Sequence, residues 1–144
     1  MENQQTRERH KKKSLRRYLN VKSCIARLEI KRDDLELRLS SPRSPNLSGM
    51  PRGGTPVTTL DLIADKSELE ERISRLKEKS KILKRDILAE IDTLEDSRYC
   101  EILEAYFIDG YTLSEIAEEN GYTDRHIFRL YSEAITLLAL KDEN

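Results

Sequence analysis

The sequence predicts an all-α protein, and three observations support that fold class. Residues with high helix propensity dominate the 144 positions, and only 6% of them are aromatic. Apolar residues recur at three- and four-residue steps over long stretches, which is the period of an amphipathic helix. All four prolines and three of the five glycines lie within residues 40–59. We therefore expect a long antiparallel, coiled-coil-like helical hairpin followed by a small three-helix domain.

A basic segment, residues 1–14, precedes the periodic part of the sequence. Residues 1–22 carry eight Lys and Arg against two Glu, a net charge of +6. Because residues 2–13 include no apolar side chain, this segment has no face to bury, and we expect a flexible arm. A cationic arm of this kind is suited to an anionic partner.

The hairpin is expected in residues 15–95. A first helical period begins at Leu15 and ends at the prolines of "SSPRSP", and residues 40–59 are predicted to form a Pro/Gly loop. A second period runs from about Thr59 to Leu94, long enough for a helix of roughly 50 Å. The two apolar stripes consist of Tyr18, Val21, Ile25, Leu28, Leu35 and Leu39, and of Leu62, Leu69, Ile73, Leu76, Leu83, Ile87 and Leu94.

A helix of that length needs a partner for its apolar stripe. The first helix can cover it by folding back, and a second copy of the chain can cover it equally well. One stripe per helix, covered on one side, favours a homo-oligomer, specifically a dimer. No apolar run approaches membrane-spanning length and no signal-peptide pattern is visible, so we expect a cytoplasmic protein with no membrane partner. Cys24 and Cys100 have no paired spacing and are expected to be reduced thiols.

Residues 96–144 are expected to form the three-helix domain. The first of its helices is predicted to begin at Asp96 or Ser97 and to end near Gly110. Thr112 to Glu115 forms a capping box that predicts the start of a short second helix. A glycine then allows a sharp left-handed turn, and a third helix is predicted from Asp124 to about Leu140. The predicted core positions are Leu113, Ile116 and Ala117 on the second helix, and Ile127, Leu130, Tyr131, Ala134, Leu137 and Leu138 on the third.

This helix–glycine–helix pattern is typical of a helix-turn-helix, whose second helix enters the DNA major groove. Arg125 and Arg129 lie one turn apart, and arginine forms paired hydrogen bonds with guanine O6 and N7. Asp124 is suited to accept from a cytosine amino group, and His126 to reach a phosphate. Thr112 and Thr123, the two predicted N-cap residues, complete the candidate DNA-binding set.

A second interpretation stays open, because helix pairs joined by a glycine turn are common in proteins that do not touch DNA. Residues 96–144 carry four Lys and Arg against eleven Asp and Glu, a net charge of −7. Glu115, Glu118 and Glu119 oppose phosphate binding, although the basic arm is able to supply cations. The alternative function is a helical adaptor, or a packaging protein of the small-terminase kind, that acts through protein–protein contacts.

The phrase "GYTLSEIAEENGYTDRHIFRLYSEAITLL" resembles the promoter-recognition region (region 4) of bacterial sigma factors, over about residues 96–140. Residues 15–140 resemble a narrower group, the phage and prophage proteins of Firmicutes related to the ArpU and RinA late-transcription regulators. In that group a helical hairpin carries a loop similar to "SPNLSGMPRGG". The chain departs from sigma factors at Phe128 and Tyr131, where polar residues are common, and the resemblance does not extend to the upstream sigma regions that open promoters.

The resemblance implies a sequence-specific DNA-binding regulator of phage late genes, an activator that recruits host RNA polymerase in the bacterial cytoplasm. Carried over by position, Asp124, Arg125 and Arg129 are the base-reading residues, and His126 contacts the DNA backbone. No enzymatic constellation is visible, and we expect no cofactor. The two histidines lack ligand spacing, which argues against a zinc site, and "PRGGTP" is not followed by the Lys-Ser/Thr of a phosphate-binding loop.

Overall fold

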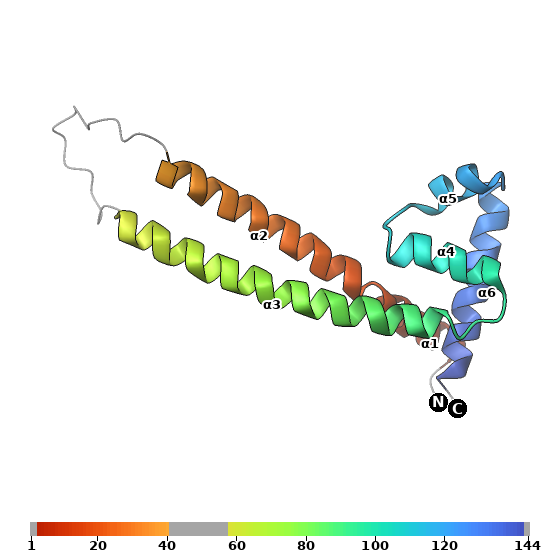
Figure 1. Cartoon of the computed structure of the whole chain (residues 1–144). Helices are drawn as coiled ribbons and strands as arrows, with labels where there is room; N and C mark the ends of the chain where they lie inside the picture. Colours follow the sequence, from red (N-terminus) through yellow and green to blue (C-terminus); the bar gives the residue numbers. More distant parts are fainter. Residues whose placement is uncertain (1–2, 41–57, 143–144) are drawn as a thin grey trace. The chain divides into compact units, whose positions relative to one another are not determined.

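The computed structural model describes residues 3–40 and 58–142, and within these ranges the chain is helical without strands (Figure 1). The predicted all-α fold class is therefore confirmed. Most of the predicted Pro/Gly loop, residues 41–57, lies outside the described residues. The helices are α1 (Gln4–Leu15), α2 (Arg17–Ser40), α3 (Thr59–Ile91), α4 (Ser97–Phe107), α5 (Leu113–Asn120) and α6 (Asp124–Lys141).

The chain divides into two compact units. Unit 1 comprises residues 1–22 and 79–144, and unit 2 comprises residues 23–78. The expected division after residue 95 differs from this one, because the boundaries fall within α2 and α3. The cause is a shared core: Leu15, Ile87 and Ile91 belong to the same apolar cluster as Leu103 and Phe107 of α4. The α4–α6 domain is thus completed by α1 and by the ends of the hairpin helices.

Within the described residues, unit 2 is a pair of helical segments that belongs to the hairpin predicted for residues 15–95. Its parts of α2 and α3 run antiparallel, and Lys66 Nζ lies 3.4 Å from Glu36 Oε1 across the pair (Figure 1). Ile25, Leu28 and Ile73 are buried between the helices. The remaining stripe residues of the described part of unit 2, Leu35, Leu39, Leu62, Leu69 and Leu76, are only half-buried.

Helix α1 corrects the expectation of a flexible basic arm. Residues 4–15 are helical, and Asn3 caps them by accepting a hydrogen bond from the Thr6 N–H at 2.9 Å. The helix packs against α6: Leu15 is fully buried, and Thr136 donates to Glu8 at 2.8 Å. The segment has a face to bury after all, because the long stems of its charged side chains cover apolar surface while their heads find polar partners.

Lys11 shows how a charged residue becomes part of this core. Its side chain is buried, and its ammonium group pairs with Glu90 of α3 and, at 2.7 Å, with Asp142 at the end of α6. Burial alone would lower the pKa of Lys11, but the hydrogen bonds to Asp142 and Glu90 and their charges outweigh burial and raise it. Lys11 therefore joins three helices and is not available to an external anion.

The core of unit 1 is centred on α6, which is buried on two sides because α4 and α5 cover one part of it and α1 another. The rings of Tyr106 and Phe107 pack edge to face with centroids 4.8 Å apart, and Tyr106 packs against Tyr131 at 5.1 Å. One predicted core position is wrong: Leu137 is 41% exposed, whereas Ile135 is fully buried. The second covered side of α6 explains this difference.

Candidate nucleic-acid interface

The α5–α6 turn is held by local hydrogen bonds that the sequence predicts. At the start of α5, the Thr112 hydroxyl accepts from the Glu115 N–H at 3.1 Å, and Glu115 Oε1 accepts from the Thr112 N–H at 3.3 Å. At its end, Gly121 adopts a left-handed conformation with φ of 70°. The Tyr122 N–H donates to the Ala117 carbonyl at 2.8 Å, which closes a Schellman motif. Both the capping box and the glycine turn are therefore confirmed.

The start of α6 is fixed by Thr123, whose hydroxyl accepts from the His126 N–H at 3.1 Å. This confirms the predicted N-cap. The Thr112 hydroxyl is engaged more fully, since it also donates to Glu115 Oε1 at 3.0 Å. Both threonines thus have a structural role in the turn, whatever else they contact.

The first turns of α6 present a continuous surface of exposed and half-buried side chains. We call it the α6 surface and define it as Arg125, His126, Phe128, Arg129 and Ser132. Arg125, Phe128, Arg129 and Ser132 follow one another at helical steps of three, one and three residues and so share one face. The α6 surface and Thr123 line a shallow hollow of about 500 Å³. The structure therefore brings four of the predicted site residues together, while Asp124 and Thr112 do not line the hollow.

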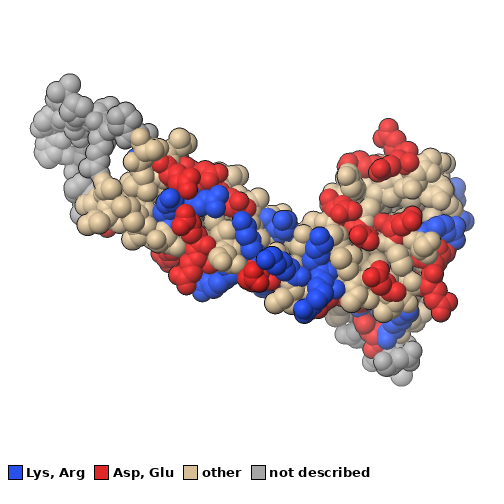
Figure 2. All heavy atoms as spheres, in the orientation of Figure 1, with Lys and Arg blue, Asp and Glu red and all other residues tan. Residues whose placement is uncertain are grey.

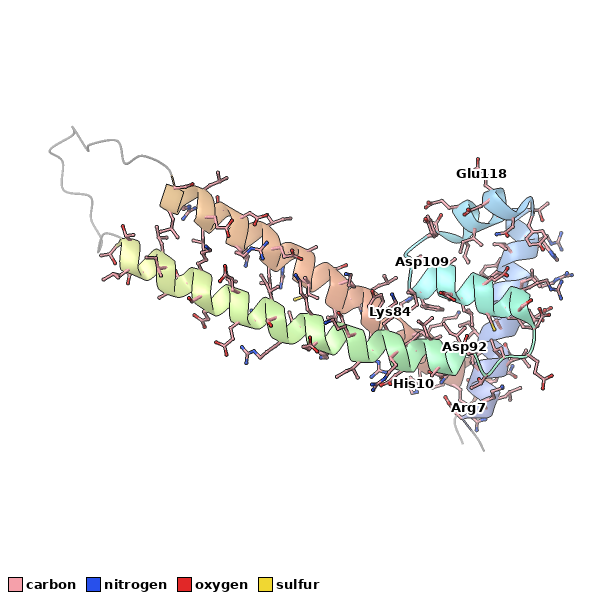
Figure 3. The ribbon with its side chains drawn as sticks, in the orientation of Figure 1. Arg7, His10, Lys84, Asp92, Asp109 and Glu118 are labelled. Carbon is pink, nitrogen blue, oxygen red and sulfur yellow. The ribbon has the colours of Figure 1, made fainter. Side chains whose placement is uncertain are left out.

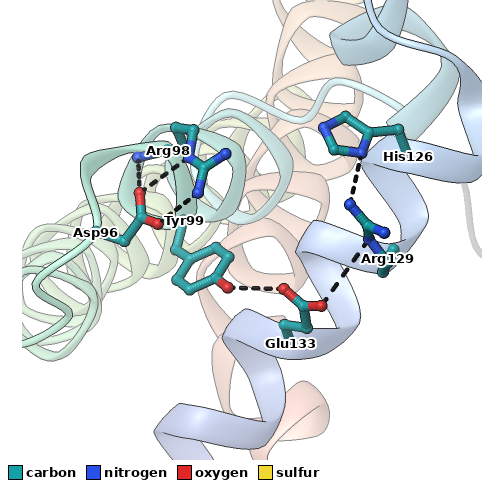
Figure 4. A network of polar contacts seen from close by, with 6 residues as sticks. All are labelled: Asp96, Arg98, Tyr99, His126, Arg129 and Glu133. Atoms are coloured by element: carbon teal, nitrogen blue, oxygen red, sulfur yellow. Dashed lines mark hydrogen bonds and ion pairs between the residues drawn. The ribbon is translucent and has the colours of Figure 1, made fainter.

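Arg129 is held by a chain of polar contacts (Figure 4). Tyr99 of α4 donates to Glu133 Oε2 at 2.7 Å, and Glu133 Oε1 lies 3.9 Å from Arg129 Nε. Arg129 Nη2 lies 3.1 Å from His126 Nδ1. Because a guanidinium group only donates hydrogen bonds, His126 Nδ1 is the acceptor in this contact. The Glu133 hydrogen bond raises the pKa of Tyr99.

Arg125 differs from Arg129. Among the described residues it makes no hydrogen bond or ion pair, and it is exposed. The guanidinium of Arg129 is oriented by its neighbours, yet its side chain remains 65% exposed. The α6 surface thus offers one guanidinium group oriented by its neighbours and one that is exposed to solvent, two donors of the kind that recognises paired acceptors.

His126 is more enclosed than its predicted outward position implies. It is half-buried, and its ring packs edge to face against Tyr122 with centroids 4.9 Å apart. A third arginine, Arg98, lies at the start of α4, where its guanidinium pairs with Asp96 at 2.9 Å (Figure 4). It does not line the hollow of the α6 surface. The hydrogen bond from Arg98 holds the pKa of Asp96 below its usual value.

Acidic side chains gather beside the α6 surface rather than within it. Figure 2 shows them spread over the part of unit 1 that holds α4 and α5. Glu115, Glu118 and Glu119 are exposed, and Figure 3 shows Glu118 projecting outward from α5. Cationic groups come from α1, where Lys12 Nζ lies 5.7 Å from the ring centroid of Tyr131 and where Arg9 and Lys13 are exposed.

Sequence reasoning missed Tyr99 and Glu133 as supports of Arg129. The four-residue spacing of Arg129 and Glu133 is a readable signal for an ion pair within one helix. The Tyr99 contact has no such signal, because it joins residues 34 positions apart on different helices.

Comparisons with models of protein families, with curated protein sequences and with solved structures gave no match. None of the described helices is long and apolar enough to span a membrane. Within residues 3–40 and 58–142, no group of three or more His, Cys, Asp or Glu side chains is placed to hold a metal ion.

Proposed function

We propose that the chain is a sequence-specific DNA-binding transcriptional regulator that inserts the α6 surface into the major groove. The observation that carries this proposal is the exposed face of the first half of α6, which presents Arg125 and Arg129 after a glycine turn. Helix-turn-helix proteins read base edges with this part of their second helix. Each guanidinium group is suited to one guanine, which presents two acceptors, O6 and N7, in the major groove.

The phage context of the proposal rests on the sequence resemblance to late-transcription regulators. On that basis we propose that the protein binds double-stranded DNA upstream of phage or prophage late genes in the bacterial cytoplasm. There it activates transcription by recruiting host RNA polymerase. The exposed acidic residues of α5 supply a second surface, distinct from the α6 surface, for such a protein contact.

We also propose that unit 2 joins two copies of the chain into a dimer. Ile30 and Leu37 are 70% and 66% exposed on α2 and lie two turns apart. If a second α2 packs antiparallel, Ile30 of each copy faces Leu37 of the other. Analytical ultracentrifugation of the full chain at micromolar concentrations is expected to give the mass of a dimer, and a monomer would contradict this part.

The decisive experiment begins with selection of bound duplexes from a random-sequence library, followed by fluorescence titration at several salt concentrations. We expect wild-type affinity for the selected duplex to fall steeply with salt, because binding releases counterions from the phosphates. Arg125→Ala is expected to cost about 1–3 kcal/mol of discrimination against a changed base pair, the usual value for a lost arginine–guanine contact. Helix content by circular dichroism should remain unchanged.

Arg85→Ala provides a matched control. Arg85 is an arginine of α3 in unit 1 whose side chain is 75% exposed, and its loss removes the same charge without touching α6. Equal effects of Arg85→Ala and Arg125→Ala would show that only net charge matters and would contradict recognition by the α6 surface. Failure to select any duplex would contradict the proposed function as a whole.

The helical adaptor remains the second candidate, favoured by the exposed acidic residues of α5. The double substitution Glu118→Gln and Glu119→Gln separates the two functions. Stronger DNA binding by this variant would place both carboxylates near the duplex. Loss of a protein partner with unchanged DNA binding would support the adaptor.

A further inference from the structure

Phe128 is an exposed aromatic residue in the middle of the α6 surface. Its neighbours Ile127, Leu130 and Tyr131 are almost fully buried, whereas Phe128 is 60% exposed. Its ring touches the edge of the core, with its centroid 6.5 Å from that of Tyr131. A single exposed apolar residue is ordinary on a protein surface, so exposure alone assigns no role. What distinguishes Phe128 is its position between two arginines.

The arrangement of this face matches the chemistry of a mixed sequence in the major groove. Arg125 and Arg129 flank Phe128 on the same side of α6, and all three line the same hollow. In the major groove guanine presents two acceptors, while thymine presents a C5-methyl group, to which apolar side chains such as Phe bind. An arginine and a phenylalanine side by side therefore fit a guanine next to a thymine.

The spacing along the helix agrees with neighbouring base pairs. Phe128 lies three residues after Arg125, which corresponds to about 4.5 Å along the helix axis. Base pairs are stacked about 3.4 Å apart. Two side chains three residues apart thus reach adjacent base pairs when the helix lies in the groove.

We propose that Phe128 is a specificity-determining residue that contacts the C5-methyl group of a thymine next to the guanine contacted by Arg125. This inference rests on the proposed function and adds a base preference to it. The contact buries a ring that water otherwise surrounds, and it discriminates against cytosine, which lacks the methyl group and presents an amino group instead.

The test uses the duplex selected by the wild-type chain, with each thymine replaced in turn by deoxyuridine. That replacement removes the methyl group and leaves base pairing intact. For wild type, we expect one position at which the replacement weakens binding roughly fourfold, the factor for burying one methyl group. For Phe128→Ala, the ratio of the dissociation constants for the deoxyuridine and thymine duplexes should approach one. Phe128→Leu, which keeps an apolar side chain, should show a ratio close to that of wild type.

Leu137→Ala is the matched control, because Leu137 is also an exposed apolar residue of α6, 41% exposed, and lies two turns beyond Arg129. Its thymine-to-uracil ratio should equal that of wild type. An unchanged ratio in Phe128→Ala, or no sensitive thymine in a duplex that still depends on Arg125, would overturn the inference and leave the proposed function intact. If no duplex is selected at all, both fail together. If Phe128→Ala abolishes only binding to RNA polymerase, the residue belongs to a protein contact and the inference is overturned.

Discussion

The two units of this chain bury their apolar residues to different extents. In the described part of unit 2, only Ile25, Leu28 and Ile73 are buried, and they form one narrow seam between α2 and α3. In unit 1 the helices surround a core of many buried residues. All six tyrosines and both phenylalanines of the sequence belong to unit 1. Aromatic side chains bury the largest areas of any residues, so the units differ in the size of their side chains as well as in their number.

This comparison is consistent with the separate roles that we propose for the two units. A core covered from several sides holds the start of α6 and its Arg129 contacts in place, as the proposed recognition surface requires. A seam covered on one side leaves apolar surface for another helix. Regions with few buried contacts also open more readily than a core does. We therefore expect unit 1 to resist unfolding longer than unit 2.

The largest expected effect tests that difference with the same substitution in both units. Leu103 of unit 1 is fully buried, and Leu28 of unit 2 is 1% exposed. Leu103→Ala should cost about 3–5 kcal/mol, because a core covered from several sides collapses only partly into the cavity. Leu28→Ala should cost about 2–3 kcal/mol, because two helices close a gap more easily. Urea unfolding followed by circular dichroism measures both, and a larger loss for Leu28→Ala would reverse the comparison.

Much of the α5–α6 region was predictable because its determinants are local. The Thr112–Glu115 capping box, the Gly121 turn and the Thr123 N-cap each join residues at most five positions apart. Short spacings leave a signal in the sequence, since helix starts and ends depend on a few side chains. The candidate interface was predictable for the same reason, because the position at which α6 begins determines that Arg125 and Arg129 lie in its first two turns.

The role of α1 was not predictable, because its partners are distant in sequence. Glu8 meets Thr136, and Lys11 meets Asp142, both across more than 120 positions. A segment whose buried contacts are made by charged side chains shows no apolar period, so pattern reasoning assigns it to solvent. The same missing helix explains the error at Leu137, since covering α6 from a second side moves the buried positions to Ile135 and Ala139.

Tyrosine occurs only in unit 1, so alkaline pH should destabilise that unit through its buried phenol group. Burial raises the pKa of Tyr131 from 10.0 to about 12. Between these values the unfolded chain loses the phenolic proton and the folded chain keeps it, so stability falls as pH rises from 10 to 12. The two pKa values correspond to about 2.7 kcal/mol, and solvent screening reduces the expected loss to about 1–2 kcal/mol.

Urea unfolding at pH 8, 10 and 11.5 measures this loss, and Tyr131→Phe is the control. The variant should lose less stability over that range, because its ring has no proton to release. The residual loss should come partly from Lys11, whose raised pKa stabilises the folded state only while the ammonium group stays charged. Hydrogen exchange should place the alkaline opening in unit 1. Opening confined to residues 23–40 and 58–78, the described part of unit 2, would contradict the assignment.

The smallest expected effect compares one lysine from each unit. Lys11 is 7% exposed and pairs with two carboxylates, whereas Lys66 of unit 2 is 30% exposed and pairs with Glu36 and Glu70. Lys11→Met should cost about 1–2 kcal/mol, because Glu90 is left partly buried without its cation. The loss stays below that of a fully buried pair, since Asp142 returns to water. Lys66→Met should change stability by at most about 0.5 kcal/mol, as exposed ion pairs do. Equal losses of stability in the two variants would mean that the Lys11 contacts of α1 stabilise unit 1 no more than a surface ion pair stabilises unit 2. The difference between the cores of the two units would then depend on α3 to α6 alone.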